Sequence, residues 1–175
     1  KKGHGGFYRH RRMARALINA GHDVVWISPD INTDIGEQFL PLREYFDWIP
    51  GPIGWVLKVR ANLLFYRDHL YDVDAVFTTK EYDAFGCTLD KCVGRLPHIF
   101  FTHGDTINCE KFLAKYSLKF SRRLKSRIML MYYPWLQRRI LKKFSHVVVQ
   151  ADFLANVLKE RHPNVNCNYI VLTSD

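Results

Sequence analysis

Glycine residues are concentrated at the start of this sequence, where they could form a binding loop. Gly3, Gly5 and Gly6 stand directly before a helical pattern. Glycine lets a backbone turn sharply and approach a ligand closely, and a helix N-terminus offers free N–H groups and a positive dipole end. The stretch therefore suits a phosphate or another anion, although a tight turn without a ligand would have a similar sequence.

One histidine and two acidic residues form the second group with chemical potential. His103 follows the apolar run 98–102, which is typical of a buried strand. Its imidazole could donate or accept a proton near neutral pH. Glu81 and Asp83 follow another strand-like run and could contact substrate hydroxyl groups from a loop. The alternatives are a structural histidine that closes a strand and two solvated loop acids.

Short apolar runs and helical patterns alternate along the chain. Strands are expected at 24–27, 74–79, 98–102, 145–150 and 169–173. Helices are expected at 7–20, 53–70, 84–93, 111–133, 135–144 and 153–161, with Pro134 as an interruption and 29–52 as an irregular segment. This alternation predicts an α/β fold with a Rossmann-like, doubly wound parallel sheet. Ligands bind at the carboxyl ends of such strands, where the glycine-rich start, 80–83 and 103–106 would meet.

The bulk composition indicates a folded domain. The chain has 175 residues, of which 47% are hydrophobic, so we expect one domain, 1–175, with a substantial core. The apolar runs are too short to span a membrane. The four cysteines form no CxxC pair and the sequence shows no cluster of metal ligands, so we expect reduced thiols in a cytoplasmic protein and no metal. A first strand upstream and a further domain downstream are also expected, because the chain starts in a loop and stops after a strand.

The positive charge of the chain is confined to one segment. The net charge is +9, and eleven of the 26 Lys and Arg residues lie between Lys111 and Phe144, where there is no Asp or Glu. The rest of the chain holds the other 15 cations and all 17 acidic residues, so its net charge is close to zero. In the same segment one apolar residue recurs at every fourth position: Phe112, Tyr116, Phe120, Leu124 and Ile128.

This basic segment has three interpretations. A basic helix with an aromatic stripe can lie on an anionic membrane surface, with Arg122, Arg123, Lys125 and Arg127 as candidate contacts. A basic, aromatic surface can also bind nucleic acid, but the helical repeat of the aromatic residues argues against base stacking. Alternatively, the apolar stripe packs on the sheet and the cations face water.

Several motifs, in a fixed order, resemble the N-terminal domain of GT-B fold glycosyltransferases of family 4. Gly5-Gly6, then ARAL at 14–17 and GHDV at 21–24, is similar to the family's GG, ARAL and GHEV. The run 97–104 looks like the family's strand that ends in His-Gly. The run 145–151 resembles a later strand, and 170–175 stands where the family enters its second domain with V-I-P-N-G-V-D. The bulky Phe7-Tyr8 and the ending Thr-Ser-Asp depart from the family pattern.

The resemblance implies the acceptor-side half of a glycosyltransferase of the hexosyltransferase type. Such an enzyme transfers a sugar from a nucleotide-sugar donor to a cell-surface glycan or glycolipid acceptor, here with retention and without a metal or other cofactor. His103 would be catalytic beside the transferred sugar, and Gly5, Gly6 and Gly104 would lie at the donor phosphates. The family's donor motif, two Glu residues separated by seven others, belongs to the second domain and is absent from this chain, so the fragment alone should be inactive.

Two rival functions fit the same sequence features. A sugar-nucleotide epimerase could have the same fold and would be distinguished by its C-terminal sequence. A non-enzymatic basic module could bind a membrane or nucleic acid, and moderate salt would then release it from an anionic matrix. In the membrane interpretation, the cytoplasmic protein would be peripheral to the inner face of the membrane.

Overall fold

The architecture is known from a computed structural model that describes four stretches of the chain, residues 5–29, 39–49, 51–102 and 104–171. The chain divides into two compact units, 1–72 and 73–175, each of which is described by itself. The prediction of a single domain stays a prediction.

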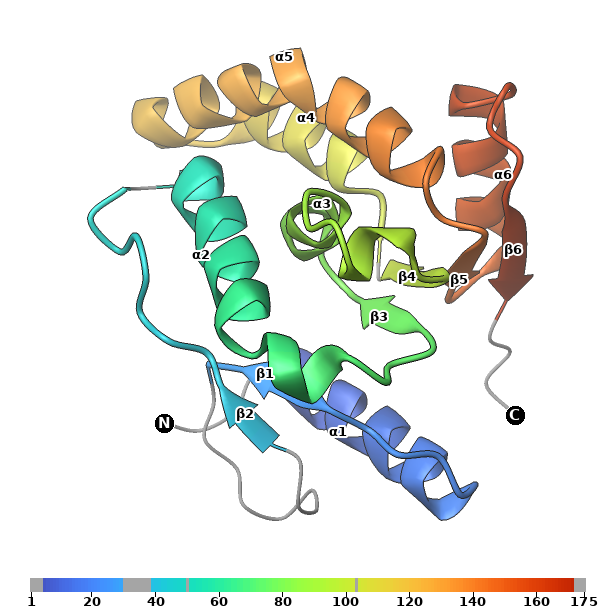
Figure 1. Ribbon diagram of the computed structural model, residues 1–175. Helices are drawn as coiled ribbons and strands as arrows, with labels where there is room; N and C mark the ends of the chain where they lie inside the picture. The colour runs from blue at the N-terminus through green and yellow to red at the C-terminus, as the bar shows by residue number, and fades with distance from the viewer. Residues whose placement is uncertain (1–4, 30–38, 50, 103, 172–175) are drawn as a thin grey trace. The chain divides into compact units, whose positions relative to one another are not determined.

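The first unit holds two short parallel strands and two helices. Its elements are α1 (Gly5–Asn19), β1 (Trp26–Ser28), β2 (Phe39–Pro41), α2 (Gly51–Phe65) and the 3-10 turn η2 (Arg67–Leu70) (Figure 1). β1 pairs with β2 in parallel, with Trp26 opposite Phe39. The prediction of an irregular chain between 29 and 52 missed β2, because three residues ending in proline give too short an apolar pattern.

Helix α1 ends as its sequence predicts. Gly21 has a positive φ of 87°, which glycine adopts at low cost. The Gly21 N–H donates to the Ile18 carbonyl, and the His22 N–H donates to the Leu17 carbonyl. This pair of bonds is the Schellman motif, which satisfies carbonyls at a helix C-terminus. The start of the helix differs from the prediction, since α1 begins at Gly5 and includes both glycines in its first turn.

Helix α2 and the residue that follows it hold the end of β2 and the next segment through two polar side chains. Asn62 is buried, accepts from the Arg43 N–H at 2.8 Å and donates to the Arg43 carbonyl at 3.1 Å. The Tyr66 hydroxyl donates to the Pro41 carbonyl at 2.6 Å. Val56 and Leu63 are buried, whereas Leu64 is 52% exposed.

The second unit is a four-stranded parallel sheet with helices between its strands. Its elements are β3 (Val76–Thr78), α3 (Glu81–Thr88), the turn η3 (Val93–Arg95), β4 (His98–Thr102), α4 (Thr106–Tyr116), α5 (Phe120–Leu141), β5 (His146–Val149), α6 (Asp152–Arg161) and β6 (Asn168–Val171) (Figure 1). The strand order is β3-β4-β5-β6, with every neighbouring pair parallel. The predicted Rossmann-like α/β class is confirmed, and β4 has its predicted limits.

Two predictions about the helices of this unit are wrong. The expected loop after β3 is helical, since α3 begins at Glu81. Helix α5 runs through Pro134 without ending there. Proline removes one backbone N–H and so leaves a carbonyl of the preceding turn without its donor. Pro134 lies on the exposed side of α5, where water can hydrogen-bond that carbonyl.

The core of the second unit forms where α5 and α6 meet the central strands. Phe100 on β4, Val147 and Val149 on β5, and Ile140 on α5 are almost completely buried. Phe144, directly after α5, stacks on Phe100 with a ring-centroid distance of 5.8 Å. These apolar contacts hold β4 firmly, and the position that follows β4 is the one that carries His103.

His98, the first residue of β4, is a structural histidine inside this core. Its ring lies 4.7 Å from that of Phe144, and its Nε2–H donates to the Val93 carbonyl at 2.9 Å. Among the described residues, Nδ1 is buried without a hydrogen-bond partner. Burial lowers the pKa of His98, and the nearby Lys143 lowers it further, against the opposing effect of the Val93 carbonyl. The folded protein therefore keeps this imidazole neutral.

We predict that His98→Gln makes the protein less sensitive to mild acid. Because the pKa of His98 is lowered from 6.5, the unfolded chain binds a proton more readily, and stability falls as the pH drops below 6.5. One such histidine accounts for at most about 1.4 kcal/mol between pH 7.5 and 5.5. Glutamine can still donate to the Val93 carbonyl but does not titrate. Urea denaturation at both pH values measures the loss, and an equal loss in the variant would contradict this account.

Candidate functional site

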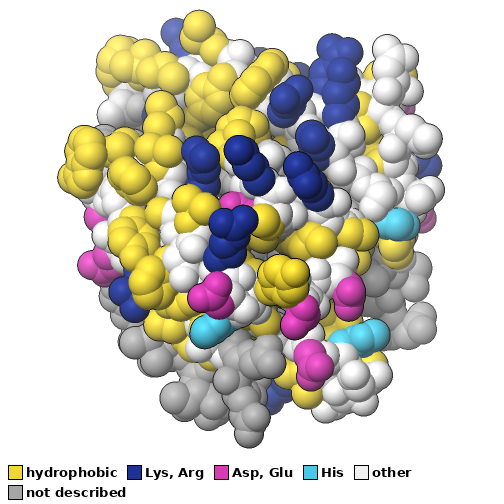
Figure 2. Space-filling view, in the orientation of Figure 1, with side chains coloured by type: hydrophobic (Ala, Val, Ile, Leu, Met, Phe, Trp, Pro, Cys, Tyr) yellow, Lys and Arg dark blue, Asp and Glu magenta, His cyan; other side chains and the backbone are white. Residues whose placement is uncertain are grey.

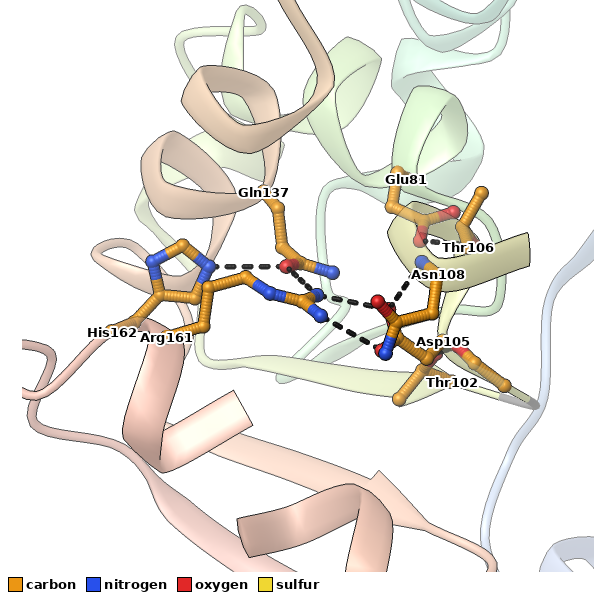
Figure 3. A network of polar contacts seen from close by, with 9 residues as sticks. Glu81, Thr102, Asp105, Thr106, Asn108, Gln137, Arg161 and His162 are labelled. Carbon is orange, nitrogen blue, oxygen red and sulfur yellow. Dashed lines mark hydrogen bonds and ion pairs between the residues drawn. The ribbon is translucent and has the colours of Figure 1, made fainter. Parts of the chain in front are cut away.

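The candidate site lies where β3 and β4 end and the next helices begin. A hydrogen bond of 3.1 Å from the Thr106 hydroxyl to Glu81 Oε1 joins the start of α4 to the start of α3 (Figure 3). β3 and β4 are neighbours and parallel, so the bond ties together two adjacent carboxyl ends of the sheet. In open α/β sheets this is the edge that binds ligands.

Glu81 differs from its sequence prediction in its surroundings. It is buried, in the first turn of α3, and not a solvated loop acid. Burial raises the pKa of Tyr133, and the charge of Glu81 and its hydrogen bond with the Tyr133 hydroxyl raise it further. Glu81 thus contacts both α4 and α5 inside the unit. Asp83 lies in the same helical turn and is half-buried.

Asp105 is the residue that fixes the start of α4. It is the N-cap, and its Oδ1 accepts from the Asn108 N–H at 3.2 Å. Both carboxylate oxygens also accept from Arg161, the last residue of α6, at 2.9 and 2.8 Å. Burial alone would raise the pKa of Asp105, but the hydrogen bonds from Arg161 and the Asn108 N–H outweigh it and hold the pKa below its usual value. Asp105 is therefore a charged, fixed cap.

Gln137 extends this contact into α5. Its Oε1 accepts from Arg161 Nη1 at 3.2 Å and lies 3.0 Å from His162 Nε2 (Figure 3). The same amide oxygen faces both groups, and arginine can only donate, so His162 Nε2 must also be the donor. Burial lowers the pKa of His162, and the charges of Arg161 and Arg138 add to the effect. His162 is a neutral structural residue that supports the Arg161 side chain.

His103 lies outside the described residues, but the residues on both sides of it are described. Thr102, the end of β4, donates from its hydroxyl to the Gly104 carbonyl at 3.1 Å. Asp105 is held by Arg161, as above. A Cβ added at Gly104 would meet none of the described atoms within 4 Å, and Gly104 is exposed. Thr102 and Asp105, which stand on either side of His103 in the sequence, are therefore both held by hydrogen bonds at the ligand edge of the sheet.

The glycine-rich start belongs to the other unit. Gly5 and Gly6 open α1, while Gly3 and His103 lie outside the described residues. The expected meeting of this stretch with His103 at one edge stays a prediction.

The sequence did not reveal the contact between Asp105 and Arg161. The two residues are 56 positions apart and come from different helices, so no local pattern links them. The local signal was the residue type of Asp105, because aspartate is a favoured N-cap residue and its side chain accepts from the backbone N–H three positions later. Gln137 gave no signal of its own.

Two negative observations concern the described residues alone. Within them, no group of three or more His, Cys, Asp or Glu side chains is placed to hold a metal ion. The helices of the same stretches include none that is long and apolar enough to cross a membrane. The expectation that the reaction needs no metal stays a prediction.

The fold and the site define a Rossmann-like domain with a ligand edge at the ends of β3 and β4. A model of the family described as Glycosyltransferase Family 4 matches residues 5–170. The chain therefore belongs to glycosyltransferase family 4, and the resemblance seen in the sequence is confirmed. Comparisons with curated proteins and with solved structures gave no match.

We predict that Asp105→Asn destabilises the protein by about 2 kcal/mol, because it removes the charge-assisted bonds to Arg161. Asparagine still caps α4, so Asp105→Ala should cost about 1 kcal/mol more. Because the pKa of Asp105 is lowered, the ion pair stabilises the protein above pH 3.8 and its contribution is lost as the pH falls through the folded-state pKa. Urea denaturation at neutral and acid pH measures both effects.

Asp90 provides the matched control for this experiment. It accepts from the N–H groups of Cys92 and Val93 at 2.9 Å, and no hydrogen bond from arginine to it is among the contacts that the structure describes. Asp90→Asn should therefore change stability little. Equal losses in the two Asn variants would show that Arg161 contributes nothing to the effect.

Proposed function

We propose that this domain is the acceptor side of a two-domain hexosyltransferase that uses a nucleotide-sugar donor. The acceptor is a glycan or glycolipid of the cell surface, and the sugar is transferred with retention of its anomeric configuration. The observation that carries the proposal is the family match over residues 5–170. The parallel sheet supports it, because its strand ends supply an edge suited to ligands.

His103 is the catalytic residue in this proposal. Its position directly after β4 supports the role, since β4 is buried in the core and Asp105 is held two residues later. A transition-state contact requires positional precision, which fixed neighbouring residues favour. The imidazole hydrogen-bonds a hydroxyl of the transferred sugar as charge develops in the transition state.

The donor diphosphate contacts backbone N–H groups of Gly5, Gly6 and Gly104. Gly5 and Gly6 suit this role because they open a helix of fifteen residues, whose N-terminus favours negative charge. The leaving phosphate takes the acceptor proton itself, so the reaction needs neither a dedicated carboxylate base nor a metal. Glu81 and Asp83, both in the first turn of α3, are the candidates for contacts with acceptor hydroxyl groups.

We predict that His103→Ala lowers turnover of the full-length enzyme by about a hundredfold or more, as loss of a transition-state contact does. His146→Ala is the matched control, because His146 is half-buried and stands at the opposite end of its strand, at the start of β5. Steady-state kinetics with sugar-nucleotide donors measures the difference. Wild-type turnover in the His103 variant would assign this histidine a structural role.

A second prediction uses the open space around Gly104. Its φ is not in the left-handed region, and an added Cβ meets none of the described atoms, so Gly104→Ala should leave thermal stability unchanged. If the donor approaches this backbone closely, the methyl group should raise KM for the donor by about tenfold, equivalent to 1.4 kcal/mol. An unchanged KM would remove Gly104 from the donor site.

A further inference from the structure

The helical hairpin formed by α4 and α5 carries an apolar surface that the proposed function does not explain. The two helices pack side by side and are joined by residues 117–119 (Figure 1). Its exposed apolar residues are Phe112, Tyr116, Leu118, Phe120, Leu124, Ile128, Met131 and Trp135. Leu118 is 100% exposed and Met131 84%. The alternative interpretation, in which the stripe packs on the sheet, is therefore wrong.

The exposed residues of α5 form one continuous row, here called the apolar row. It consists of Phe120, Leu124, Ile128, Met131 and Trp135, whose spacing of three or four positions places them on one helical face. Ser126, Tyr133 and Gln137 are buried and each follows a member of the row by two positions, about 200° around the helix. The hairpin thus uses one face for the core and leaves another apolar face in solvent.

Cations accompany this row, and acidic residues do not. Between 111 and 144 the sequence has no Asp or Glu. Lys115 and Lys119 flank the exposed tip at Leu118, and Lys125 and Arg127 project from the first half of α5. Figure 2 shows hydrophobic and Lys or Arg side chains together over the part of the molecule where Figure 1 draws the hairpin.

The four cations first expected to contact a membrane are not equivalent. Arg122 donates to Glu110 Oε1 at 3.4 Å, so it turns into the hairpin toward a buried carboxylate. Arg123 is half-buried, with its guanidinium 6.0 Å from the centroid of the Phe120 ring. Lys125 and Arg127 are exposed. These last two residues are the ones that a surface in front of α5 would meet.

We propose that the α4–α5 hairpin docks on the surface of an anionic lipid bilayer. The apolar row and Leu118 enter the boundary between headgroups and acyl chains, and the neighbouring cations contact lipid phosphates. Charge decides between a bilayer and a protein partner, since the centre of a protein interface is usually depleted of Lys. An acid-free basic segment around an apolar face fits a surface that is both anionic and apolar. This inference does not depend on the identity of donor or acceptor.

The charge contribution can be tested with the full-length protein and two kinds of vesicle, one containing phosphatidylserine and one purely phosphatidylcholine. Each cation near an anionic surface changes the partition coefficient by about fivefold. Replacing Lys125 and Arg127 by Gln should therefore lower partitioning onto the anionic vesicles by about 30-fold. Lys91→Gln with Arg95→Gln is the matched control, because both residues are exposed in the same unit but outside the hairpin.

The apolar contribution needs its own pair of variants. Leu118→Ser with Phe120→Ser should weaken binding at least tenfold, because both side chains are exposed and would leave water on docking. Leu89→Ser, an exposed leucine outside the hairpin, should not weaken it. Circular dichroism confirms that each variant is folded, which is expected because none of the replaced residues is in the core.

The outcomes separate docking from its alternatives. Three results together support the proposal. The protein cosediments with anionic vesicles, high salt reduces this binding, and the hairpin variants lose it while the control variants keep it. A folded protein that binds neither kind of vesicle at low salt overturns it. Equal loss of binding in hairpin and control variants also overturns it.

Sedimentation velocity tests the alternative that the surface binds a second copy of the chain. Self-association that the Leu118 and Phe120 changes abolish, in a protein that does not bind vesicles, would assign the surface to that second copy. Sugar-transfer activity toward a soluble acceptor is measured separately, so failure of docking leaves the catalytic proposal intact.

Discussion

The paired contact between Asp105 and Arg161 is the constraint on which the second unit depends most. A carboxylate removed from water needs a compensating charge or several donors, and Asp105 has both in Arg161 and the Asn108 N–H. The pair links the turn after β4 to the end of α6, and Gln137 adds α5 to the same network. Three helices are thereby oriented around the end of the strand that precedes His103.

Helix α4 connects this constraint to the exposed hairpin. Its first turn is fixed twice, by the Asp105 cap and by the bond from Thr106 to Glu81. Its last turn leads into Leu118 at the exposed tip. Eleven helical residues span about 16 Å, so the candidate site and the proposed docking surface are the two ends of one short rigid element. A lipid surface that held the tip would also set the distance of the start of α4 from that surface.

The sequence predicted the parts of the structure that depend on local patterns. The apolar run of β4 and the glycine that ends α1 are examples, because buried strands and left-handed C-caps leave clear local signals. It failed where a distant residue decides the outcome. Glu81 is buried and has its contacts with Thr106 and Tyr133, both far away in the sequence, and Arg161 reaches Asp105 across 56 positions. The apolar stripe was identified correctly as helical. Its periodicity shows that the residues share one face of a helix, but it does not show whether that face is buried. Helix α5 has a second apolar face, and it is this one that packs in the core.

The two proposed anion-binding features of this protein differ in physical character. Backbone N–H groups at a helix N-terminus are fixed dipoles that act over a short range and are aimed at one ligand position. The hairpin cations are exposed charges on flexible side chains, and salt screens them beyond about 8 Å at physiological ionic strength. Raising the salt concentration should therefore weaken attraction to a bilayer well before it weakens a donor phosphate held by backbone groups. The excess charge of the chain lies on the hairpin, where the proposed docking would use it. At the edge of the sheet the charges of Asp105 and Arg161 are paired, so this edge would orient a substrate by hydrogen bonds more than by net charge.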